Sequence, residues 1–137
     1  MLLARAGFRT FGVDLKWEAV RDAISAASAE GVAVLGWCAD LTRSPLPGDR
    51  FDLIVVTRYL HRDLFPTLRA AVTPSGVILY ETFTVAQRAH RRGPTSPDHL
   101  LEPGELLRLF DGFEVVCYEE VPEPDAVARI VARKRSA

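Results

Sequence analysis

The sequence lacks the features that define several large classes of protein. No apolar run approaches the roughly 20 residues of a membrane-spanning helix, and Met1-Leu2-Leu3-Ala4 is too short for the core of a signal peptide. The only two cysteines, Cys38 and Cys117, have neither CxxC spacing nor neighbouring histidines, so they form no metal motif. We expect both to be buried thiols in strands, and the protein to be cytoplasmic.

An excess of charge of one sign is also missing. The chain has 17 basic and 18 acidic residues and a formal net charge of −1, which gives no reason to expect nucleic acid or an anionic membrane as a partner. Hydrophobic residues make up 48% of the chain, as in globular proteins. The length of 137 residues suits a single domain over residues 1–137.

Four short apolar runs are present, and each ends in a polar or acidic residue. In chain order they are Phe8–Asp14, Val32–Asp40, Phe51–Arg58 and Gly76–Glu81. Apolar strands with polar carboxyl-terminal ends are how an open α/β sheet builds a ligand crevice. The run from Phe51 is almost uniformly apolar, which is typical of a strand covered on both faces. Residues at helical spacing lie between the runs, at Trp17, Val20, Ile24 and Ala27 and again at Leu60, Leu64, Phe65 and Leu68.

The C-terminal part adds a short helix after Pro103 and two more strands, Phe113–Glu119 and Ala128–Arg133. The short link between these strands, Pro122–Asp125, favours an antiparallel pair. Alternating strands and helices followed by such a hairpin predict an α/β fold, with a mostly parallel sheet and an antiparallel C-terminal strand.

A long polar segment, Thr84–Glu102, follows the strand that ends near Phe83. A loop of this length in a compact domain is usually functional or mobile, so we expect a lid on the substrate side or a mobile loop. Its basic residues either attract an anionic substrate or form a solvated charged surface, the more common case. They are Arg88, His90, Arg91 and Arg92.

The strand order and the strand ends together resemble the class I S-adenosylmethionine (SAM)-dependent methyltransferases. The matching motifs are Gly12-Val13-Asp14-Leu15, Cys38-Ala39-Asp40-Leu41, Phe51-Asp52-Leu53-Ile54-Val55-Val56 and the turn Thr73-Pro74-Ser75-Gly76. The segments Tyr59–Phe65, Leu79–Phe83 and Leu100–Leu107 are similar to a tellurite-resistance-type group of small-molecule methyltransferases. The resemblance implies a Rossmann-like fold, SAM as cofactor and a small-molecule methyl acceptor.

The resemblance also implies which residues bind the cofactor. Asp14, with Leu15 beside it, holds the position that binds the ribose hydroxyls, although the aspartate alternatively caps the following helix. Asp40 holds the position that contacts the adenine amine, with Leu41 near the adenine face; otherwise it is a solvated strand-end aspartate. Thr57 and Arg58 begin the turn that lines the methionine part of SAM.

The same turn continues through the two candidate catalytic residues. Tyr59 could stack on a ligand or donate a hydrogen bond. His61 is the candidate base, because an imidazole takes up a proton near neutral pH. A surface or capping histidine is an equally common reading of His61.

One element of the family is missing from the sequence. The family's main SAM site is a glycine-rich turn after its first strand, where glycine lets the backbone approach the cofactor closely. The sequence contains no GxGxG motif, and Gly7 and Gly12 lie too late and are wrongly spaced. We therefore expect an N-terminally truncated domain that binds SAM weakly or not at all.

The family's first strand, which should come before Phe8, is also missing from the sequence, and this leaves three structural alternatives open. In the first, the sequence is a fragment or starts at an internal codon. In the second, the strands at Phe8 and Phe51 pair directly. In the third, another chain supplies the missing strand or pairs with the open edges. The last case implies a homo-oligomer formed through exposed strand edges. Three functions stay open. The chain is an impaired methyltransferase, a non-catalytic methyltransferase-like remnant that acts through dimerisation or partner binding, or a nucleotide-binding module of another Rossmann class.

Overall fold

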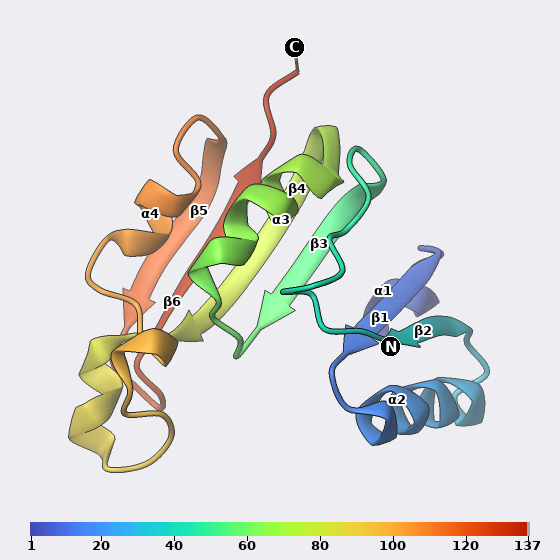
Figure 1. Cartoon of the computed structure of the whole chain (residues 1–137), viewed down its shortest axis with the longest axis horizontal. Helices are drawn as coiled ribbons and strands as arrows, with labels where there is room; N and C mark the ends of the chain where they lie inside the picture. Colours follow the sequence, from blue (N-terminus) through green and yellow to red (C-terminus); the bar gives the residue numbers. More distant parts are fainter. Residues whose placement is uncertain (137) are drawn as a thin grey trace. The chain divides into compact units, whose positions relative to one another are not determined.

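The computed structural model describes residues 1–136 and divides the chain into two compact units, Met1–Pro45 and Leu46–Ala137 (Figure 1). The boundary falls in the proline-rich loop after the second strand, where the sequence has turn-forming residues. Each unit has its own sheet, with two strands in the first and four in the second. The predicted α/β class and antiparallel C-terminal strand are confirmed. That residues 1–137 form one domain stays a prediction.

The first unit is a small β-α-β arrangement. Its elements are α1 (Leu2–Arg5), β1 (Thr10–Asp14), α2 (Trp17–Ala29) and β2 (Val34–Cys38). The two strands run parallel with Asp14 opposite Cys38, and α2 packs closely on the sheet at Gly36. A Cβ added to Gly36 would lie 2.7 Å from a methyl group of Val20, so only glycine allows this approach of helix and strand.

The second unit carries a four-stranded sheet with short helices. Its elements are β3 (Phe51–Thr57), η1 (Arg62–Leu64), α3 (Phe65–Ala71), β4 (Val72–Phe83), η2 (Val85–His90), η3 (Pro97–His99), α4 (Glu105–Leu109), β5 (Glu114–Val121) and β6 (Val127–Arg133). Strands β3 and β4 are parallel, and β6 lies between β4 and β5, antiparallel to both. Figure 1 shows α3 and α4 on the same side of this sheet.

The core of the second unit lies between this sheet and α3 and α4. Residues of β4 alternate, so that Ile78, Tyr80 and Thr82 are buried while their neighbours are half-buried. The ring centroid of Tyr80 lies 5.0 Å from that of Phe65 and 6.2 Å from that of Phe110. This aromatic cluster orders the strand ends that carry the candidate site.

Two sequence-based expectations about burial are wrong. The strand from Phe51 is not covered on both faces, since Val55 is 45% exposed; the helices pack on the opposite face of the sheet. Cys38 and Cys117 lie in strands as predicted but are exposed. The alternatives for the strands at Phe8 and Phe51 stay open, since β1 and β3 belong to the sheets of two separate units.

The predicted turn Thr73-Pro74-Ser75-Gly76 lies inside β4, where it forms an irregularity in the ladder with β3. Ser75 has a positive φ of 67°, and its N–H donates to the carbonyl of Lys134 at 2.9 Å. The segment turns locally yet stays hydrogen-bonded to the end of β6, which is why it continues the strand. No helix within the described residues has the length and apolar character needed to cross a membrane.

Candidate functional site

In the first unit the structure brings the two predicted cofactor aspartates to one edge of the sheet. Asp14 ends β1, and Asp40 follows the end of β2. Because the strands are parallel and in register at Asp14 and Cys38, their carboxyl ends meet at the same edge. Hydrogen bonds continue the pairing beyond the ends of the strands. The N–H of Ala39 donates to the carbonyl of Asp14 at 3.1 Å, and the thiol of Cys38 donates to the carbonyl of Leu15 at 3.1 Å.

Both carboxylates also organise the chain around them. Oδ1 of Asp14 accepts from the N–H of Lys16 at 2.8 Å, which shapes the entry into α2. Oδ1 of Asp40 accepts from the N–H and the hydroxyl of Thr42, at 2.9 and 2.5 Å. Asp14 and Leu15 are exposed, and Asp40 and Leu41 are half-buried. The N-cap of α2 is Lys16 and no side chain caps it, so the alternative that Asp14 caps the helix is wrong, and its exposed carboxylate can accept several further hydrogen bonds.

A hollow of about 140 Å³ lies between the β1–β2 sheet and α2, and Asp14 is its one charged lining residue. Valine, isoleucine, alanine and glycine form the rest of the lining. The volume is below the roughly 300–1,000 Å³ of small-molecule pockets. The first unit by itself thus offers an edge with two carboxylates rather than an enclosed cofactor site.

The other predicted site residues lie in the second unit, on the turn that follows β3. Thr57 is the exposed last residue of β3, opposite Glu81. Arg58 has a left-handed backbone with φ 55°, and its N–H donates to the carbonyl of Glu81 at 2.8 Å. The buried Tyr80 hydroxyl donates to the carbonyl of Tyr59, and burial raises the pKa of Tyr80. The β4 strand therefore fixes where this turn runs.

The candidate catalytic side chains differ in exposure. Tyr59 is 42% exposed, whereas His61 is half-buried and its carbonyl accepts from the N–H of Leu64 at 3.0 Å at the start of η1. The residue between them, Leu60, is 6% exposed and anchors the turn in the core. This alternation presents Tyr59 toward solvent on a fixed backbone.

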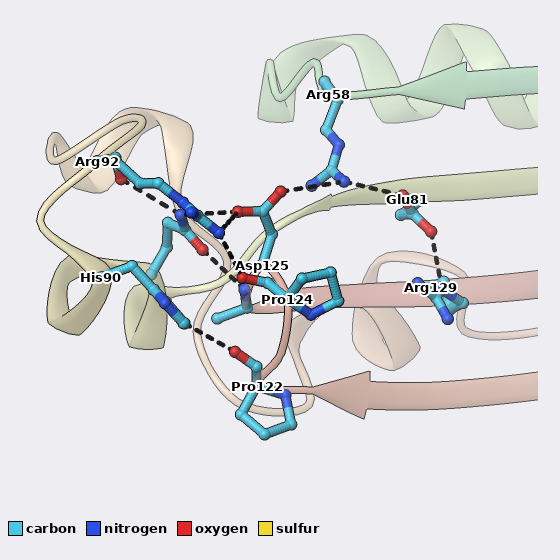
Figure 2. A network of polar contacts seen from close by, with 10 residues as sticks. Arg58, Glu81, His90, Arg92, Pro122, Pro124, Asp125 and Arg129 are labelled. Carbon is cyan, nitrogen blue, oxygen red and sulfur yellow. Dashed lines mark hydrogen bonds and ion pairs between the residues drawn. The ribbon is translucent and has the colours of Figure 1, made fainter.

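A chain of alternating charges crosses the strand ends beside this turn (Figure 2). It runs, in order of contact, through Arg92, Asp125, Arg58, Glu81, Arg129 and Glu119. The guanidinium of Arg58 also lies over the ring of Phe83, 4.5 Å from its centroid. Arg58 was predicted from the sequence as a site residue, whereas its ion pairs with Glu81 and Asp125 were not. Part of the signal was present, because Arg58 follows β3 and Glu81 lies near the end of the parallel neighbour β4.

The segment predicted as a lid or mobile loop, Thr84–Glu102, is ordered by these contacts, and we call it the strap. It contains η2 and η3, and its ends meet where the N–H of Val85 donates to the carbonyl of Leu101 at 3.0 Å. Three of the four residues in its cluster Arg88, His90, Arg91 and Arg92 bind other parts of the chain or of the strap itself. Arg92 contacts Asp125 at 2.9 Å, His90 contacts the carbonyl of Pro122 at 2.7 Å, and Arg88 donates to the carbonyl of Thr95 at 3.2 Å.

A second arginine ties the other end of the strap to the candidate turn. Arg62 forms two hydrogen bonds to the carboxylate of Glu105, at 2.7 and 2.9 Å, and donates to the carbonyls of Pro97 and Leu100. The hydrogen bond from Arg62 lowers the pKa of Glu105. Arg62 therefore connects η1, η3 and α4 around the turn that bears His61.

Comparison with known proteins places the fold. No protein-family model matches the chain, and no curated protein matches it by sequence. A SAM-dependent methyltransferase from Methanosarcina mazei superposes with a TM-score of 0.76 at 17% identity, over 99% of this chain and 86% of that one. TehB from Haemophilus influenzae gives 0.77 at 16% identity, over 97% and 52%. The [4+2]-cyclase SpnF gives 0.78 at 15% identity, over 99% and 70%.

These identities establish the fold and leave the chemistry open, because one fold hosts many activities. The similar structures include SAM-dependent methyltransferases and a protein described as a cyclase. The strand ends that carried the resemblance in the sequence are the strand ends on which the candidate site is built. The chain has the Rossmann-like α/β fold of the SAM-dependent methyltransferases.

Proposed function

We propose that this chain is a SAM-dependent methyltransferase domain that acts on a small-molecule acceptor, and that its cofactor binding is impaired. The observation that carries the proposal is the parallel register of β1 and β2, which puts Asp14 and Asp40 at one sheet edge. Ligands of open α/β sheets bind outside this edge. The similarity of fold to SAM-dependent methyltransferases supports the same assignment.

The donor and acceptor chemistry of these residues fits the nucleoside part of SAM. The exposed carboxylate of Asp14 would accept from the two ribose hydroxyls, and Asp40 would accept from the adenine amine, with Leu41 beside the ring. SAM, when bound, supplies an electrophilic methyl group on a sulfonium. The protein's task is then to bind and orient, so proximity accounts for most of the rate.

On the acceptor side we assign the turn after β3. Thr57 and Arg58 would line the methionine end of the cofactor, and Tyr59 would hold the acceptor by stacking or by a hydrogen bond. His61, half-buried on a backbone fixed by η1, would take the acceptor's proton. None of these steps requires a metal or a covalent nucleophile on the protein.

The impairment follows from the absence of a GxGxG motif in the 137 residues. Without the backbone that such a turn places under the cofactor, several convergent contacts are lost. A loss of about 3 kcal/mol corresponds to roughly 100-fold in affinity. SAM binding by this chain should therefore be weak.

We expect calorimetric titration of SAM and S-adenosylhomocysteine into the chain to give a dissociation constant weaker than about 100 μM, roughly 100-fold above a micromolar reference. In an N-terminally extended enzyme that carries the glycine-rich turn, Asp14→Ala should weaken SAM binding about tenfold or more, since hydrogen bonds to a charged group contribute ~1.5–3 kcal/mol. Asp22→Ala, an exposed carboxylate on α2, is the matched control. Micromolar binding would contradict the impairment, and an unaffected Asp14→Ala variant would exclude Asp14 from the site.

The exposed apolar strand residues favour a second candidate, a non-catalytic methyltransferase-like protein that acts through dimerisation. Leu35 of β2 and Val55 of β3 are 48% and 45% exposed, and such strands tend to associate with another chain. We expect light scattering to give a dimer or a higher oligomer that Val55→Lys weakens. Val116→Lys, the same change at a residue of β5 that is 52% exposed, serves as a comparison. A monomer at all concentrations would argue against this candidate.

A further inference from the structure

Asp125 is the meeting point of three side chains from two different parts of the second unit. Its Oδ1 accepts from Nη2 of Arg92 at 2.9 Å and from Nε2 of Gln87 at 3.3 Å. Its Oδ2 lies 3.7 Å from Nη2 of Arg58. Gln87 and Arg92 belong to the strap, while Arg58 begins the candidate turn, so one carboxylate faces both segments (Figure 2).

The strap side of this contact is built on a buried polar anchor. Gln87 is fully buried, its Oε1 accepts from the N–H of Ala126 at 2.7 Å, and its Nε2 also donates to the carbonyl of Arg92. A buried amide with all of these partners holds η2 against the turn between β5 and β6. Asp125 is next to Ala126, so its position is set by the same anchor.

The turn side of the contact is held less firmly. The two ion pairs of Arg58, to Glu81 at 3.5 Å and to Asp125 at 3.7 Å, are the longest in the chain of charges, and its side chain is 40% exposed. Its left-handed backbone, with φ 55°, is unfavourable for a residue with a Cβ. The carboxylates of Glu81 and Asp125 and the ring of Phe83 hold the side chain and so help to keep this unfavourable backbone conformation.

We infer that Asp125 is a positioning residue, which couples the strap to the turn bearing Tyr59 and His61 by holding Arg92 and Arg58 with a single carboxylate. When the strap leaves Asp125, the carboxylate is free to move, and Arg58 keeps only Glu81 as a charged partner. Conversely, a change of Arg58 loosens Asp125 and with it the strap. This coupling holds whether or not the site transfers a methyl group, so a failure of the methyltransferase proposal leaves it standing.

Limited trypsin digestion measures strap opening directly, because Arg91 and Arg92 supply cleavage sites inside the strap. We would follow cleavage after Arg91 and Arg92 by mass spectrometry in the full chain, with cleavage after Arg21 in the first unit as an internal reference. Asp125→Asn keeps the shape of the side chain and removes its charge. We expect it to speed strap cleavage about 3- to 10-fold, the range for losing charge-assisted contacts near the surface.

The decisive variant is Arg58→Gln, since Arg58 lies outside the strap and its side chain contacts Asp125 rather than the strap. It should speed strap cleavage about 2- to 5-fold. The double variant with Asp125→Asn should be no faster than Asp125→Asn alone, because both changes break one connection. Asp125→Glu should restore most of the protection. Asp111→Asn, the same chemical change at an exposed carboxylate outside the strap, should behave like the unmodified chain.

Three outcomes would overturn the inference. Additive effects of the two substitutions would mean that Arg58 and Asp125 act independently. An unchanged rate in Arg58→Gln would remove Arg58 from the coupling. Equal acceleration after Arg21 and in the strap would show general unfolding instead of local opening, and an unchanged melting temperature in the same variants checks that point.

Discussion

Phe110→Ala should lower the free energy of unfolding of the Leu46–Ala137 unit by about 3–5 kcal/mol. Phe110 is fully buried, and its ring centroid lies 5.3 Å from that of Phe65 and 5.8 Å from that of Phe113. Truncation removes the packing of α4 against the sheet and leaves a cavity that rigid neighbours cannot fill. Urea unfolding followed by circular dichroism measures the change.

Two further substitutions keep this expectation testable if Phe110→Ala does not fold. Phe110→Leu retains most of the buried volume and should cost only about 1–2 kcal/mol. Val116→Ala, at a residue of β5 that is 52% exposed, should stay within about 0.5 kcal/mol. If Phe110→Leu and Val116→Ala were equally stable, Phe110 would not be a core residue.

Arg62→Ala should produce the second largest loss of stability, about 2–3 kcal/mol, because it removes hydrogen bonds that join three elements. The guanidinium donates to both oxygens of Glu105 and to the carbonyls of Pro97 and Leu100. Its loss leaves the carboxylate of Glu105, only 12% exposed, without its cation. Arg108→Ala, which loses one bond to the carbonyl of Pro103, is the matched control for a change of arginine in the same region.

The same pair predicts a pH dependence with a defined sign. Arg62 lowers the pKa of Glu105, so the pair stabilises the folded state above the ordinary glutamate pKa of about 4.3. That stabilisation is lost as the pH falls through the lowered pKa of Glu105. The difference in unfolding free energy between the unmodified chain and Arg62→Ala should be constant from pH 5 to 7 and shrink below pH 4. A difference independent of pH would mean that the pair does not act through the charge of Glu105.

Local patterns in the sequence were enough to predict the elements and their class. The apolar run from Phe51 predicted β3, and the link Pro122–Asp125 predicted the antiparallel pair β5–β6. These predictions succeed because side-chain period and turn chemistry act over a few residues. The carboxyl-end placement of Asp14 and Asp40 followed in the same way, since it depends only on the two strands being parallel and adjacent.

Burial and the partners of each charge were decided by the tertiary structure. Val55 and Cys38 have the character of core residues and are nevertheless exposed, because burial depends on which face the helices cover. The strap has the composition of a solvated loop, yet Gln87 is fully buried within it. The hydrogen bond of Gln87 to Asp125 spans 38 positions of sequence, and that of Arg62 to Glu105 spans 43. No local pattern encodes such pairs, because they form only when strand order and helix packing bring distant segments within hydrogen-bond distance.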